Sequence, residues 1–228
     1  MRVRQLTPNL IQLTRLRFVN AYLVREGDGF TLVDTTLPRG AGALVDAAAT
    51  AGAPIKRIAL THGHGDHVGS LDELHARLDG GAEVSMPELD ARIHAGEAVV
   101  EGKLPGSWPT VKTRPDVLLQ PGDRVGSLEV VAAPGHTPGH VAFLDHRDRS
   151  LIAGDVFTTI GGAAVTSHFT FPFPLAAMAT WNKQLNLESA RSLQALEPPL
   201  LAVGHGPALH DPAAETARAI SRAHRALC

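Results

Sequence analysis

The sequence is poor in cysteine, tyrosine and tryptophan, and its charges nearly cancel. Its 228 residues include one Cys, one Tyr and two Trp, with 21 Lys and Arg against 23 Asp and Glu. The single Cys228 excludes a disulfide within the chain, and a zinc site built from thiolates needs several cysteines. A net charge of −2 provides no overall attraction to nucleic acid, so we expect no nucleic-acid partner.

Long apolar runs are also missing. No stretch approaches the roughly 18 uninterrupted apolar residues of a membrane-spanning helix, and polar residues interrupt the first segment, MRVRQLTPNLIQL. We therefore expect no membrane partner and a cytoplasmic location. No low-complexity linker and no internal repeat divides the chain, which favours a single domain over residues 1–228.

Strand and helix patterns are interleaved, as in an α+β protein. Alternating segments open the chain, and the turn at residues 27–29 predicts an antiparallel hairpin. Apolar spacing predicts helices over 40–51, 68–78, 187–196 and 212–226. Short apolar runs predict strands over 58–60, 117–120, 128–133, 141–144, 151–153 and 200–203. Residues 86–116 lack periodicity and indicate a loop or a short helix.

Histidine, in contrast, is abundant, with twelve residues, and several follow predicted strands. Four segments share one design, an apolar strand that ends in a glycine-flanked His or Asp: IALTHGHGDH, VVAAPGHTPGH, LIAGD and LAVGHGP. Strands of one sheet that end this way bring their last side chains to a common edge, where open sheets usually bind ligands. His62 and His64 lie two residues apart, so in an extended segment both rings can face one cation. The segments supply more ligands than one tetrahedral zinc accepts, and two metals sharing a carboxylate would use them all: His62, His64, Asp66, His67, His136, Asp155 and His205.

In this order and at these separations, THGHGDH, GHTPGH, AGD and GHGP resemble the metallo-β-lactamase superfamily, in particular its glyoxalase II-like branch. The resemblance covers about residues 20–210 and implies a four-layer αββα sandwich, with two sheets face to face and helices outside. It implies one metal on His62, His64 and His136, a second on Asp66, His67 and His205, and Asp155 between them. Asp34, in LVDTT, resembles the family's acid that orients a ligand imidazole.

The expected chemistry is hydrolysis of a small molecule. No GxSxG motif occurs and no Cys lies in a reactive motif, so covalent catalysis has little support. Two zinc ions would lower the pKa of bound water from about 16 towards about 7, and the resulting hydroxide would attack an ester, thioester or lactone carbonyl. Iron or manganese would also suit these ligands. We expect Asp66 to be the catalytic proton acceptor.

Other functions stay open at this point. One is a persulfide dioxygenase-like enzyme with a single iron at the positions of His62, His136 and Asp155. A β-lactamase is less favoured, because no export signal is visible, and a metal buffer would not need aspartates at strand ends. We expect His168, Trp108 and Phe171 to face the substrate, His140 to bond to backbone and His94 to lie outside the site. The oligomeric state has no signature in the sequence.

Overall fold

The computed structural model describes the whole chain, Met1 to Cys228. Its N-terminal half forms a seven-stranded sheet in chain order: β1 (Arg2–Gln5), β2 (Leu10–Arg15), β3 (Val19–Glu26), β4 (Gly29–Val33), β5 (Ile55–Ala59), β6 (Glu83–Pro87) and β7 (Val117–Leu119). The strands from β1 to β4 are antiparallel and those from β4 to β7 are parallel. Parallel neighbours need crossovers. Helices provide them: α1 (Ala41–Thr50), α2 (Gly65–Val68), α3 (Leu71–Arg77) and α4 (Glu88–His94).

The C-terminal half forms a six-stranded sheet. In spatial order its strands are β15 (Leu209–His210), β14 (Leu200–Ala202), β11 (Leu151–Ile152), β10 (Val141–Asp145), β9 (Leu128–Ala132) and β8 (Arg124–Val125). A 3-10 turn, η1 (Gly154–Val156), leads from β11 into a small hairpin of β12 (Phe157–Thr158) and β13 (Ala164–Val165). The helices of this half are α5 (Leu175–Ala179), α6 (Lys183–Gln194) and α7 (Ala213–Leu227).

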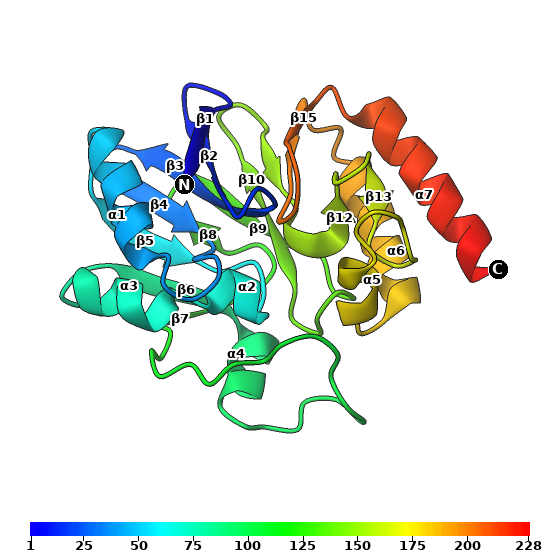
Figure 1. Ribbon diagram of the computed structural model, residues 1–228, viewed down its shortest axis with the longest axis horizontal. Coiled ribbons are helices and arrows are strands. Elements are labelled where there is room, and N and C mark those ends of the chain that lie inside the picture. Colours follow the sequence, from blue (N-terminus) through cyan, green and yellow to red (C-terminus); the bar gives the residue numbers. More distant parts are fainter.

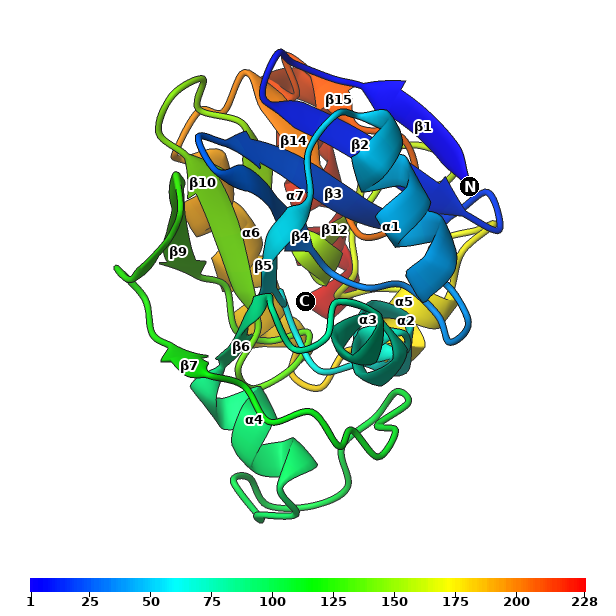
Figure 2. The same ribbon diagram turned by 90° about the vertical axis from the view of Figure 1, so that its left-hand side faces the viewer.

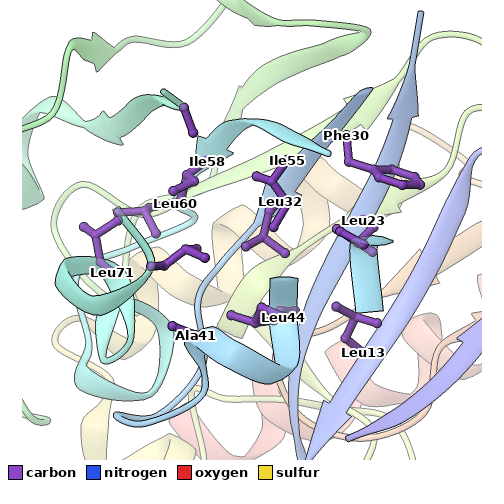
Figure 3. Close-up of a cluster of buried hydrophobic side chains, with 14 of the residues drawn as sticks. Leu13, Leu23, Phe30, Leu32, Ala41, Leu44, Ile55, Ile58, Leu60 and Leu71 are labelled. Carbon is purple, nitrogen blue, oxygen red and sulfur yellow. The ribbon is translucent and has the colours of Figure 1, made fainter. Parts of the chain in front are cut away.

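The two sheets face each other, with helices on both outer sides. Figure 1 shows α1 and α3 on one side of the molecule and α6 and α7 on the other, and Figure 2 looks onto the α1 side. Strand β3 explains this arrangement, because its side chains alternate between two apolar clusters. Ala21 and Leu23 join the cluster under α1 and α3, which Figure 3 shows, whereas Tyr22 and Val24 join the cluster between the sheets. The four-layer αββα sandwich and the α+β class are therefore confirmed.

Most predicted elements are present, with two differences. The helix expected over 68–78 is divided into α2 and α3, because the backbone leaves the helical conformation at Ser70, with φ −102° and ψ 8°. The aperiodic segment 86–116 contains the end of β6 and the short helix α4, followed by a long irregular stretch. None of the helices is both long and apolar enough to span a membrane.

Candidate metal centre

All seven predicted ligands lie together at one edge of the sandwich. Those from the first sheet follow β5, with His62 and His64 in the turn and Asp66 and His67 in α2. Those from the second sheet follow separate strands: His136 comes after β9, Asp155 after β11 and His205 after β14. The strand ends thus bring together residues that are up to 143 positions apart in the chain (205 − 62).

The ligand atoms form three overlapping clusters, each with its atoms within 4.8 Å of one another. One cluster contains His62, His64 and His136, and another contains Asp66, His67 and His205. The third joins them, because it contains His62, His67 and Asp155. The first two clusters match the ligand sets that the family resemblance implies for two metals.

Asp155 lies between the two main clusters. Its Oδ2 is 3.5 Å from His136 Nε2 in one cluster and 3.0 Å from His205 Nε2 in the other. Its Oδ1 is 3.4 Å from His67 Nε2. The side chain is almost fully buried, so both oxygens face these histidines and not bulk water.

Three of the imidazoles are oriented by oxygens that can only accept hydrogen bonds. His67 Nδ1 donates to Asp34 Oδ2 at 2.8 Å. His205 Nδ1 donates to the Phe18 carbonyl at 3.1 Å, and His64 Nε2 lies 3.3 Å from the Pro105 carbonyl. Each of these ring nitrogens must carry the proton of the neutral ring, which leaves the opposite, inward nitrogen with a free lone pair.

The other two imidazoles also donate from their outer nitrogen, in this case to threonine hydroxyls. His62 Nδ1 lies 3.0 Å from Thr61 Oγ1, and His136 Nδ1 lies 3.0 Å from Thr180 Oγ1. Thr61 donates its only hydroxyl proton to Asp34, and Thr180 donates to a backbone carbonyl, so both hydroxyls accept from the rings. When the rings are neutral, all five inward nitrogens are therefore available to a cation.

Atoms that lack partners show that this donor set fits metal ions. His62 Nε2, His67 Nε2 and Asp155 Oδ1 are buried and have no hydrogen-bond partner. Leaving a buried polar atom unpaired costs about 1–3 kcal/mol, so three of them in one place need an explanation. Imidazole nitrogens and carboxylate oxygens without thiolates suit zinc, iron and manganese. Imidazoles held from behind are typical of metal ligands.

The histidines of the two clusters differ in pKa. Burial lowers the pKa of His64 to about 4 and keeps that of His62 and His136 well below the usual value. Burial also lowers the pKa of His205, but the carboxylates of Asp155 and Asp66 outweigh it and raise the pKa to about 9. Positive charge is thus strongly attracted to the Asp66 and His205 side.

Asp34 lies directly behind the centre. Besides its contact with His67, its carboxylate accepts hydrogen bonds from the Thr61 backbone N–H and hydroxyl, both at 2.8 Å. One buried acid therefore fixes His67 directly and His62 through Thr61.

Sequence reasoning missed a second such acid, Asp90 of α4. Its buried carboxylate accepts from Gly63 N–H at 2.8 Å and the Thr137 hydroxyl at 2.7 Å through Oδ2, and from Gly139 N–H at 2.8 Å through Oδ1. These bonds join the loop of His62 and His64 to the loop of His136. Burial raises the pKa of Asp90 to about 6, although these hydrogen bonds oppose the rise. A lone acid in an aperiodic segment carries no local signal of this role.

Two histidines outside the ligand set have defined contacts. His140 Nε2 accepts a hydrogen bond from the Asp155 backbone N–H at 3.0 Å, which agrees with the structural role expected for it. His94, expected to lie outside the site, does not line the cavity but contacts the loop that carries His62 and His64. Its Nε2 is 2.8 Å from the Gly63 carbonyl, between two ligands, and its ring packs on Trp108. The helix α4 brings His94 there from the segment that has no periodicity.

A cavity of about 730 Å³ opens over the cluster. Its lining includes the five ligands that face it, His64, Asp66, His136, Asp155 and His205. Of the three residues predicted to face the substrate, Trp108 packs edge-on against the His64 ring but does not line the cavity.

His168 and Phe171 do not line it either, which corrects that prediction. Phe171 is 94% exposed and belongs to a separate hollow beside Arg218 and Arg222. Phe173 lines the cavity instead, with its ring centroid 4.9 Å from that of His205. The period-two pattern of phenylalanines misled because residues 169–174 form bends and irregular backbone and not an extended strand.

Relatives in sequence match most of the chain. A protein of Bacillus subtilis named "Uncharacterized protein YobT" is 41% identical over 213 residues, which is 91% of both chains. "Probable metallo-hydrolase YybB" of the same organism is 29% identical over 90% of this chain and 91% of its own. A hydroxyacylglutathione hydrolase of Acidiphilium cryptum is 32% identical over 62% of this chain, but the match spans only 50% of that protein.

Solved structures share the fold. A metallo-beta-lactamase from Pontibacter korlensis superimposes with a TM-score of 0.74 at 20% identity, over 98% of both chains. A protein solved in a di-iron-bound form superimposes with a TM-score of 0.62 at 29% identity, over 89% of this chain and 94% of its own. The sequence profile of the metallo-beta-lactamase superfamily matches residues 14–205, which span every residue of the cluster. The chain belongs to the metallo-beta-lactamase superfamily.

Proposed function

We propose that this protein is a binuclear metallo-hydrolase that cleaves an ester, thioester or lactone bond of a small molecule. The observation that carries the proposal is the position of Asp155, whose carboxylate reaches ligand atoms of both histidine clusters within 3.5 Å. A buried carboxylate shared in this way supports a bridge between two cations. Relatives that are named as hydrolases support the reaction class.

The ligand sets follow from the clusters. His62, His64 and His136 would hold the first metal, and Asp66, His67 and His205 the second, with Asp155 shared. We propose zinc for both, although iron or manganese suits the same donors. Metal ions bound there lower the pKa of water towards about 7 and polarise a carbonyl group.

Asp66 is the proposed proton acceptor. Its side chain is about one-third exposed and lines the cavity, whereas that of Asp155 is enclosed. Burial raises the pKa of Asp66, but the hydrogen bond from His205 and the charge of His67 outweigh this and hold it well below its usual range. The carboxylate is thus ionised at neutral pH and can orient a water molecule and accept its proton.

The alternatives have weaker support. An enzyme with a single iron on His62, His136 and Asp155 would leave the cluster of Asp66, His67 and His205 without a role. A β-lactamase activity is supported only by a similarity in fold, at 20% sequence identity. A small molecule is the proposed partner. The single domain and the cytoplasmic location stay predictions.

The proposal is tested by substituting the proposed proton acceptor and one proposed metal ligand. The variants are assayed on a panel of esters, thioesters, lactones and β-lactams. Asp66→Asn removes the proton acceptor and should lower kcat by about 100-fold or more. His62→Ala removes a ligand and should lower both the metal content and the turnover. Asp46→Asn and His224→Ala change the same residue types at exposed positions and should have no effect.

Circular dichroism should show that all four variants keep the fold. Unchanged turnover in Asp66→Asn or His62→Ala would contradict the proposal. So would a metal-loaded protein that cleaves no member of the panel.

A further inference from the structure

Apart from the ligand histidines, the cavity over the metal centre has no basic side chain in its lining. Among its lining residues there is no Lys and no Arg, whereas Asp66 and Asp72 both contribute carboxylates. Two basic side chains of neighbouring segments are occupied elsewhere. The Arg15 guanidinium donates to the carbonyls of Leu37 and Pro38, and Lys183 lies over the Phe169 ring, 4.8 Å from its centroid.

Large apolar side chains surround the mouth of the same cavity. Phe18, from the turn between β2 and β3, and Phe173 lie against the His205 ring, with centroids 6.3 and 4.9 Å from it. Leu175 and Met178 of α5 complete the rim, and they are 61% and 60% exposed. Apolar side chains that are exposed together on one concave surface typically mark a binding site.

These two features together define what the cavity can bind. Away from the metals, a carboxylate on the substrate would find no Lys or Arg in the walls, and the ionised Asp72 would repel it. An apolar group would instead bury the exposed faces of Leu175 and Met178. Because the rim adjoins the metal cluster, that group lies next to the bond that is cleaved.

We propose that the substrate is uncharged and carries an apolar acyl group, and that the cavity disfavours acyl carriers with free carboxylates, such as glutathione. This inference rests on the proposed function. In the reaction, water adds its hydroxyl to the acyl carbon, the carbon–sulfur or carbon–oxygen bond breaks, and the leaving sulfur or oxygen takes the proton. The products are an apolar carboxylic acid and an uncharged thiol or alcohol.

The test compares two thioesters that share an acyl group. S-butyryl-N-acetylcysteamine has an uncharged thiol, whereas S-butyrylglutathione carries two carboxylates and an ammonium group. We expect kcat/KM to be at least about tenfold higher for the uncharged thioester, since unpaired charge in a binding site costs several-fold to many-fold in affinity. Lengthening the acyl chain from acetyl to hexanoyl should raise kcat/KM by up to about fourfold for each buried methylene.

Met178→Arg places a cation at the rim and should reverse this preference. It should raise kcat/KM for the glutathione thioester and lower it for the uncharged one. Val3→Arg is the matched control, because Val3 is 55% exposed on β1 and does not line the cavity. It adds the same charge to the molecule and should change neither value.

The outcomes separate the inference from the function on which it rests. Equal or better cleavage of S-butyrylglutathione by the unmodified protein would overturn the inference and leave the hydrolase intact. A preference that Met178→Arg and Val3→Arg change equally would also overturn it. Failure to cleave either thioester or any ester or lactone would overturn the proposed function itself.

Discussion

The cavity has a floor, formed by the seven proposed ligands, and a mouth, formed by Phe18, Phe173, Leu175 and Met178. The two regions differ in how their side chains are held. On the floor, every ligand imidazole is held from behind by an oxygen, and almost every side chain is buried. At the mouth, Leu175 and Met178 are more than half exposed. The comparison indicates that the floor determines the chemistry, whereas the mouth determines which molecules reach it.

The largest expected effect comes from breaking the floor at its centre. Asp155→Ala removes the carboxylate shared by the two clusters and leaves His67 with Asp34, and His205 with Asp66, as their only acidic partners. We expect retention of at most one metal per chain and loss of kcat by about 1,000-fold or more, on the scale of removing a principal group that stabilises the transition state. Metal analysis and steady-state kinetics measure both. Full occupancy with normal turnover would show that Asp155 is not a bridge.

A smaller effect is expected behind the ligands. Asp34→Ala leaves the Thr61 N–H and His67 Nδ1 without their acceptor, although no proposed metal ligand is removed. Metal affinity should fall by about 10- to 100-fold, as is typical when the group that orients a ligand is lost. Competition with a chromophoric chelator gives the dissociation constant. An unchanged constant would mean that the imidazoles do not need to be held.

Asp90→Asn is expected to have a related but weaker effect. An amide keeps one acceptor oxygen, so at least one of the bonds to Gly63, Thr137 and Gly139 is lost while the volume of the side chain is kept. We expect a metal affinity about tenfold lower, on the low side of the effects seen when groups behind metal ligands are changed. Asp116→Asn, which changes an acid that bonds to the Val84 N–H away from the centre, should leave the affinity unchanged. Equal losses in both variants would reduce Asp90 to a general stabilising residue.

The smallest effect is expected at the mouth. Met178→Ala removes apolar surface from the rim and should raise KM for S-butyryl-N-acetylcysteamine several-fold with little change in kcat, since only uniform binding is lost. Metal content should stay the same. A fall in kcat equal to the change in kcat/KM would place Met178 in the chemistry and erase the distinction between mouth and floor.

The residues of the floor could be predicted from the sequence because each lies in a short motif that can be recognised without the rest of the fold. His62, His64, Asp66 and His67 lie within six consecutive residues, and the distant ligands each follow an apolar strand with a glycine beside them. The four-layer sandwich came from the family resemblance of these motifs. The helices α1, α6 and α7 came from apolar periodicity, within a few residues of their bounds.

The parts that were missed depend on contacts between distant segments. Asp90 and His94 reach the centre only because α4 packs across the loop at Gly63, and nothing near them in sequence signals this. At the mouth, the spacing of Phe171 and Phe173 assumed an extended strand, whereas the backbone bends there and only Phe173 faces the cavity. Loops that lack regular structure also lack the periodicity that predicts which side chains point into a cavity.

Metal stoichiometry tests the central claim most directly. The protein is stripped with a chelator, the chelator is removed, and zinc is added back in measured equivalents while bound metal and thioester turnover are followed together. We predict that two equivalents bind per chain, and that turnover reaches its maximum only as the second is bound. Saturation and full turnover at one equivalent, or turnover that survives complete removal of metal, would contradict the binuclear site.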